Sequence, residues 1–221
     1  MDLEESLHTA QLLIAQQKLN DADAAMEQLL QSQPSHVEAL FTKAVIRRLQ
    51  KQPKDALQTL DTLHAIDPQH SRAFQEKGHL QMANRELQPA IDAYESAVAR
   101  DPALIVSWKA LMGLHAMDNN PKGANTARIH VEKLQALPQE LLNISSLINE
   151  KRLDIAEPLC RKFLQQDSHN VEAMRLLAAI GVELGITDDA EQLLEAALKF
   201  DPGFHHGRFD YVGVLQQRQK F

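Results

Sequence analysis

The sequence of 221 residues has one cysteine, eight scattered glycines and few aromatic side chains, at 5% of the chain. The lone Cys160 cannot form a disulfide within the chain, so a disulfide-stabilised scaffold is excluded. It lies on the expected packing face of a helix, where a buried free cysteine acts as a small apolar side chain. No cationic cluster supports the alternative of a reactive thiol.

Basic residues are fewer than acidic residues, 23 against 30, and the net charge is -7. This balance argues against a general nucleic-acid surface or an anionic-membrane surface. No run of about eighteen apolar residues occurs, which excludes a membrane-spanning helix. We also expect no secretory leader, because no charged segment is followed by an apolar one at the start. These features predict a cytoplasmic protein.

What the sequence does contain is a periodic proline. Pro34, Pro68 and Pro102 follow one another at intervals of 34 residues, and Pro202 has the same local context. Each proline lies between two stretches with helical patterning, where its fixed φ and missing N–H end one helix without harming the next. The interval therefore predicts one helical hairpin per repeat.

Other positions recur in the same frame. Between residues 71 and 104 a bulky residue, two small residues, an aromatic residue, a third small residue and the proline follow in order as Phe74, Gly78, Ala90, Tyr94, Ala97 and Pro102. This pattern resembles the tetratricopeptide repeat, which the same period indicates. The resemblance implies an all-α solenoid whose function is to hold another molecule.

The frame divides the chain into six repeats and a last helix. They are 3–36, 37–70, 71–104, 105–138, 137–170, 171–204 and the terminal helix 205–221. We therefore predict an all-α fold, an α-α superhelix that forms a single solenoid over residues 1–221. The frames overlap by two residues, so we expect an irregular joint near Leu137–Pro138. A solenoid needs its apolar end covered, so we expect the natural chain to continue past Phe221 or another chain to cover the end, for example by end-to-end self-association.

Small residues support the predicted hairpins, since paired helices approach closely only over short side chains. One position of the second helices holds alanine in every repeat: Ala22, Ala56, Ala90, Ala124, Ala156 and Ala190. We also expect Asn120 and Thr187 to cap second helices and Gly185 to end a first helix in the left-handed conformation.

Patterns for chemistry are absent. The ten histidines include the adjacent pair His205 and His206, which point about 100° apart on a helix, and no HExxH motif accompanies them. There is no phosphate-binding glycine motif and no GxSxG nucleophile motif. We expect no metal, no cofactor, no catalytic residue and no enzymatic activity in this chain.

The predicted function therefore depends on the concave face, lined by first-helix residues that point away from the second helices. Its apolar side chains and isolated cations suit a protein or peptide ligand that brings apolar side chains and carboxylates. The alternative is that these are ordinary solvated helix faces. The predicted groove residues are Phe41, Val45, Arg72, His79, Met82, Lys109, Met117, Arg175 and Phe209.

One narrower partner can be tested by comparison of positions. Tetratricopeptide modules that bind the acidic C-termini of heat-shock chaperones use Lys, Asn and Arg on successive first helices. The matching places hold Leu7, Gln11, Thr42, Arg72 and Glu76, of which only Arg72 carries the required charge. A chaperone clamp is therefore disfavoured.

Residues 137–221 contain the runs Leu137-Pro138-Gln139-Glu140-Leu141, Ala156-Glu157-Pro158-Leu159-Cys160-Arg161 and Asp189-Ala190-Glu191-Gln192-Leu193-Leu194-Glu195. In these runs the segment resembles the repeat region of bacterial tetratricopeptide-containing sulfotransferases. In that family the repeats precede a domain that binds 3′-phosphoadenylyl sulfate, and no such domain is present in these residues. The sequence leaves two hypotheses open: an interaction scaffold, or the non-catalytic arm of a sulfotransferase that recruits its substrate.

Overall fold

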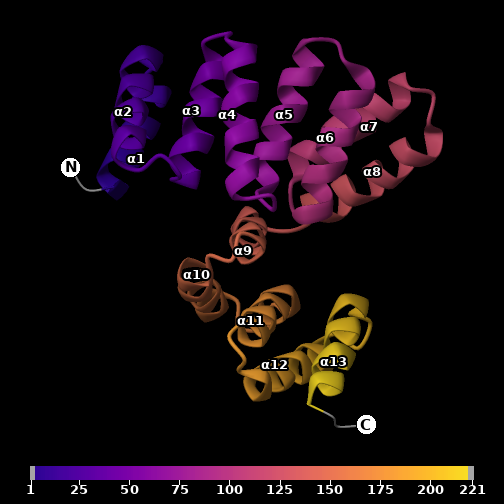
Figure 1. The fold of residues 1–221 in the computed structure, drawn as a ribbon. Helices are drawn as coiled ribbons and strands as arrows, with labels where there is room; N and C mark the ends of the chain where they lie inside the picture. The colour runs from indigo at the N-terminus through magenta and orange to yellow at the C-terminus, as the bar shows by residue number, and fades with distance from the viewer. Residues whose placement is uncertain (1–2, 219–221) are drawn as a thin grey trace. The chain divides into compact units, whose positions relative to one another are not determined.

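The computed structural model describes residues 3–218, and this range contains α-helices and no β-strand (Figure 1). The all-α class expected from the sequence is confirmed. The last three residues of the predicted helix 205–221 lie outside the described range. In chain order the helices are α1 Leu3–Ala15, α2 Leu19–Ser32, α3 Val37–Leu49, α4 Pro53–Ile66, α5 Ser71–Ala83, α6 Leu87–Arg100, α7 Ile105–Met117, α8 Pro121–Gln135, α9 Gln139–Asn149, α10 Leu153–Gln166, α11 Val171–Glu183, α12 Thr187–Phe200 and α13 His205–Gln217.

The chain divides into two compact units, residues 1–131 and residues 132–221. The first contains α1 to α7 and most of α8, and the second contains α9 to α13. The joint expected near Leu137–Pro138 lies in the connection between α8 and α9, a few residues beyond the division. That the two units continue as one solenoid stays a prediction.

Within each unit, successive helices pack as hairpins and each hairpin packs on the next. In the first unit α1, α3 and α5 contact one another in series, and in the second unit α9, α11 and α13 do the same. Apolar side chains are buried in small clusters between neighbouring helices, such as Leu60 and Leu63 in one and Ile144 and Leu177 in another. Such clusters form from local contacts, as expected for repeats that bury their apolar faces against their neighbours.

Each hairpin turn reverses through one residue with positive φ. These residues are Gln17, Lys51, Arg85, Asn119, Lys151 and Gly185. The prediction for Gly185 is confirmed by its φ of 76° just after α11. The prediction for Asn120 is also confirmed, since its Oδ1 accepts a hydrogen bond of 2.9 Å from the N–H of Gly123. The prediction for Thr187 is wrong, because α12 begins at this residue and Ile186 occupies the cap.

The alanine position of the second helices is buried in five of the six repeats. No surface is exposed at Ala22, Ala56, Ala90, Ala156 and Ala190. Because their side chains end at Cβ, the backbone of the paired helix can approach each of them closely. The α5–α6 hairpin also uses a glycine, since a Cβ at Gly78 would lie 2.9 Å from ring atoms of the buried Tyr94.

The α7–α8 pair is packed less closely than the other hairpins within the described residues. On α7 the bulky Met112 occupies the position that is small in four other first helices, where the residues are Ala10, Ala44, Gly78 and Ala178. A longer side chain between two helices sets a larger separation of their axes.

Two stacked rings connect α7 and α8. Trp108 and His130 stack with a centroid separation of 4.0 Å and an interplanar angle of 4°. Ala124 is only partly buried, whereas Ala127 on the same helix is 1% exposed. The prediction that Ala124 lies at a close packing position is therefore wrong.

Candidate functional site

The first helices of the first unit carry seven of the predicted groove residues, and polar contacts connect these helices. Arg72 on α5 forms an ion pair of 3.1 Å with Glu38 on α3, and the Arg48 guanidinium on α3 binds the carboxylate of Glu76 on α5. Between α5 and α7, the hydroxyl of Ser107 donates a hydrogen bond of 2.9 Å to the side-chain amide oxygen Oε1 of Gln75. This face is therefore internally bonded as well as partly exposed.

Phe41 and Arg72, both predicted to bind a partner, contact each other. The Arg72 guanidinium lies over the Phe41 ring at 4.7 Å from the ring centroid, within the range of cation–π attraction. The ring of His70 is 5.1 Å from the same ring. A ligand that binds Phe41 or Arg72 therefore contacts side chains that already contact each other.

His79 is half-buried and bonded to its own hairpin. The Tyr94 hydroxyl lies 2.6 Å from His79 Nδ1, so the two side chains share a hydrogen bond between α5 and α6. Burial lowers the pKa of His79, and burial also raises the pKa of Tyr94 to about 12. Both side chains are thus favoured in their neutral forms, and His79 serves the packing of its own hairpin.

Met82, Lys109 and Met117 differ from these residues because their side chains are exposed. Met82 on α5 is 47% exposed and Met117 on α7 is 72% exposed. Lys109 on α7 is exposed and makes no ion pair or hydrogen bond to any residue in the range 3–218. Val45 on α3 is half-buried. These side chains are the ones available to a ligand without rearrangement.

In the second unit, Arg175 on α11 is bound by two carboxylates. It contacts Glu172 at 2.6 Å and Asp210 on α13 at 3.0 Å. Burial alone would lower the pKa of Arg175, but the bonds to these carboxylates raise it, so the guanidinium stays charged. Phe209 on α13, by contrast, is 82% exposed. The structure therefore brings Arg175 into an internal ion pair and leaves Phe209 accessible.

The sequence interpretation missed the ion pairs among the first helices. Glu38 and Arg72 occupy the same repeat position on neighbouring helices and carry opposite charges. Arg175 and Asp210 are likewise separated by about one period, at 35 residues. Opposite charges one repeat apart on first helices were the signal that could have predicted these contacts.

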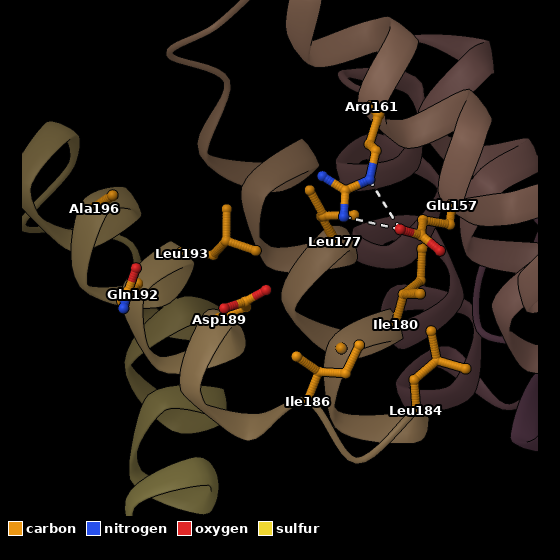
Figure 2. A pocket seen from close by; sticks show the side chains of 11 residues that line it. Glu157, Arg161, Leu177, Ile180, Leu184, Ile186, Asp189, Gln192, Leu193 and Ala196 are labelled. Atoms are coloured by element: carbon orange, nitrogen blue, oxygen red, sulfur yellow. Dashed lines mark hydrogen bonds and ion pairs between the residues drawn. The ribbon is translucent and has the colours of Figure 1, made fainter.

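A hollow of about 370 Å³ lies on the second-helix side of the second unit, between α10, α11 and α12. Figure 2 shows that the Asp189 carboxylate and Leu193 extend from α12 toward α11, while Arg161 and Glu157 form an ion pair on the far wall. The sequence interpretation did not predict this site. Its other lining residues are Leu177, Ile180, Gly181, Leu184, Ile186, Gln192 and Ala196.

Residues that could support metal or thiol chemistry do not converge in the described part of the chain. Within it, no three His, Cys, Asp or Glu residues are grouped as metal ligands. Cys160 is buried, and burial raises the pKa of its thiol to about 11. None of the helices between residues 3 and 218 combines the length and apolarity required to span a membrane.

Comparisons with known proteins agree with the helical hairpins. A tetratricopeptide repeat model matches residues 13–77 and 147–208, more than half of the chain. No curated protein is significantly similar to it.

Solved structures share the fold at low sequence identity. The pilF protein of Pseudomonas aeruginosa is 16% identical with a TM-score of 0.56, over 97% of this chain and 96% of that chain. MamA is also 16% identical with a TM-score of 0.52, over 91% and 96% of the two chains. The complex of Naa15/Naa10 bound to HypK-THB is 19% identical with a TM-score of 0.55; the match covers 98% of this chain but 34% of that chain. From its repeat spacing, its stacked hairpins and the matched family model, the chain belongs to the tetratricopeptide repeat family, whose members commonly mediate interactions between proteins.

Proposed function

We propose that the protein is a non-catalytic scaffold whose first unit binds a segment of another protein along the face of α3, α5 and α7. The observation that carries this proposal is the exposure of Met82, Lys109 and Met117 on neighbouring first helices. Exposed methionines adapt to varied apolar side chains, and an unpaired ammonium group attracts a carboxylate. A ligand with apolar side chains and at least one acidic residue fits this chemistry.

Phe41, Val45, Arg72 and His79 complete this surface in a supporting role. Arg72 can bind a ligand carboxylate only while it also binds Glu38. Lys109 is therefore the principal cation of the predicted groove in the first unit. In the second unit Arg175 and Phe209 are the corresponding candidates, with Phe209 as the exposed anchor. The ligand is a protein segment in each case, and no nucleic acid, membrane or cofactor takes part. The location of this binding is the cytoplasm.

A capture experiment tests the proposal. Wild-type chain and a Lys109→Glu, Met117→Ser double variant are used to capture proteins from a lysate of the source cell. The variant is expected to lose a protein that the wild type captures, because the substitutions remove the exposed cation and an exposed apolar side chain. Lys122→Glu is the matched control, since Lys122 is exposed on the second helix α8. Identical capture by all three proteins would indicate ordinary solvated helix faces.

A second candidate function comes from the sulfotransferase resemblance of residues 137–221. These residues fall within the second unit, 132–221, so the resemblance covers one compact body. In this proposal the unit recruits the protein substrate of a larger enzyme, and the sulfate donor binds elsewhere. The test is sulfate transfer from 3′-phosphoadenylyl sulfate by the product of the complete gene and by the 221-residue chain. Activity of the complete product alone supports this function, and activity of neither product rejects it.

A further inference from the structure

The turn between α11 and α12 differs in chemistry from the other hairpin turns. In the five other turns, all three residues at the equivalent positions are polar or charged. They are Gln16-Gln17-Lys18, Gln50-Lys51-Gln52, Asn84-Arg85-Glu86, Asp118-Asn119-Asn120 and Glu150-Lys151-Arg152. In the last turn the sequence is Leu184-Gly185-Ile186, so two aliphatic side chains flank a glycine where polar side chains are the rule.

Leu184 and Ile186 are exposed to solvent, at positions where the other turns have polar residues. Each side chain is 48% exposed, and both line the hollow between α10, α11 and α12 (Figure 2). Ile186 also occupies the N-cap of α12, where it makes no capping hydrogen bond. Serine, threonine, asparagine or aspartate at an N-cap would stabilise the helix. The N-caps of α2, α4, α6 and α10 also lack a capping bond, so the two exposed aliphatic side chains, and not the missing cap, distinguish this turn. Apolar side chains exposed together are typical of interaction surfaces.

The floor of the hollow continues this apolar surface. Leu177 and Ile180 of α11 form this floor and are 7% and 1% exposed. Leu193 of α12 forms the facing wall. The volume of about 370 Å³ is within the range of ligand-binding pockets. An aliphatic side chain of a partner would therefore find apolar contacts on several sides.

The charges around the hollow leave one carboxylate without a counter-ion. Glu157 is paired with Arg161 at 2.8 Å across the far wall. Elsewhere on α12, Arg218 binds both Asp188 and Glu191. Asp189 lines the hollow and makes no ion pair or hydrogen bond to any residue that the structure describes. The site thus has an apolar floor and one unneutralised negative charge at its edge.

We propose that this hollow is a second protein-docking site, separate from the first-helix face, and that it binds a segment in which an aliphatic side chain is close to a lysine or arginine. The aliphatic side chain packs on Leu184, Ile186 and the floor, and the cation pairs with Asp189. An acidic segment, which suits Lys109 in the first unit, would be repelled here. The two sites therefore select partners of opposite charge.

Selection from a display library of short random peptides tests this proposal on the whole 221-residue chain. The expected result is enrichment of peptides that combine Leu, Ile or Met with Lys or Arg. The enriched peptide is then synthesised, and its affinity for each variant is measured by fluorescence anisotropy. Ile186→Ser is expected to weaken binding about tenfold, as loss of a buried aliphatic contact does. Because serine is a favoured N-cap, this variant is also expected to retain or raise the unfolding midpoint.

Charge variants give the matched comparison. Asp189→Lys is expected to weaken binding about tenfold or more, since it replaces attraction by repulsion. Asp188→Asn is the control, because Asp188 lies one residue away on α12 and binds Arg218 instead of lining the hollow. It is expected to leave the affinity within about twofold, as for a site outside the contact. A selection without enrichment, or enriched peptides that bind Ile186→Ser and Asp189→Lys as tightly as the wild type, would overturn the proposal.

Discussion

Arg72 on α5 forms an ion pair of 3.1 Å with Glu38 on α3, and the two residues hold the same repeat position one period apart. The side chains are 29% and 27% exposed, so water weakens their attraction but does not abolish it. The pair connects two first helices that both carry predicted groove residues. Part of the predicted binding surface is therefore also part of the stacking between hairpins.

Charge reversal tests this relationship. Arg72→Glu places two carboxylates opposite each other and is expected to destabilise the chain by about 1 kcal/mol. The double variant Glu38→Arg, Arg72→Glu restores opposite charges and is expected to recover most of that loss. The measurement is the urea midpoint of the wild type and the two variants. If the double variant is no more stable than Arg72→Glu, the ion pair makes no contribution.

The alanine position of the second helices provides a matched pair of substitutions. Ala90 is fully buried in the α5–α6 hairpin, so Ala90→Leu is expected to cost roughly 1 to 3 kcal/mol by overpacking. Ala124 holds the same repeat position in the wider α7–α8 pair and is partly exposed. Ala124→Leu is therefore expected to cost much less. Equal shifts of the two unfolding midpoints would contradict the difference in packing.

His70 makes the stability of α5 dependent on pH. Its Nδ1 accepts a hydrogen bond of 3.1 Å from the N–H of Ala73, which requires an unprotonated ring nitrogen. Burial, and then the charge of Arg72, lowers the pKa of His70 from 6.5. A pKa that is lower in the folded state contributes stability above the unfolded value, and this stability is lost as the pH falls through the folded value. Acidification below about pH 6.5 is therefore expected to lower the unfolding midpoint.

Asparagine at the equivalent position of another repeat caps its helix without titrating. Asn170 caps α11 through its Oδ1, which accepts a hydrogen bond of 3.0 Å from the N–H of Ala173. His70→Asn is therefore expected to keep the cap of α5 and to reduce the difference in urea midpoint between about pH 7.5 and about pH 5.5. An undiminished difference would assign the pH dependence to other residues.

Cys160 is expected to be inert in the folded protein. The thiol is fully buried, lies 3.2 Å from the carbonyl oxygen of Ala173, and has its pKa raised to about 11 by burial. Since the thiolate is the reactive form, a disulfide reagent at neutral pH is expected to label Cys160 only after the chain unfolds. Absorbance of the released thiol, with and without urea, measures this. Rapid labelling without urea would contradict the buried placement.

Much of the fold could be predicted from the sequence because the repeat positions are set by short-range packing. Prolines one period apart and alanines at one helical position were enough to predict the all-α hairpins, and Gly185 and Asn120 marked the end of α11 and the start of α8. Ala124 was misjudged because its burial depends on Met112 in the partner helix, which the repeat frame treats as a separate position. A pattern within one helix does not determine the distance between two helices.

The candidate site was less predictable. The repeat frame identified which residues share the first-helix face, but it does not pair charges, so Arg72 and Arg175 were predicted as isolated cations. Their partners are Glu38 on a neighbouring first helix, Glu172 three residues earlier on α11, and Asp210 on α13. The hollow beside α12 was not predicted because the repeat frame does not include the positions of the hairpin turns. The signal in the sequence is that Leu184 and Ile186 are aliphatic at places that are polar in the other turns.

The most direct test of the central claim uses a photo-crosslinking amino acid at single positions of the chain in the source cell. At Met82 and Met117 on the first helices, crosslinks to the same partner protein are expected. At Gln58, an exposed residue on the second helix α4, the crosslink to that partner is expected to be absent. A partner that crosslinks at Gln58 as strongly as at Met82 and Met117, or at none of the three, would contradict binding on the first-helix face.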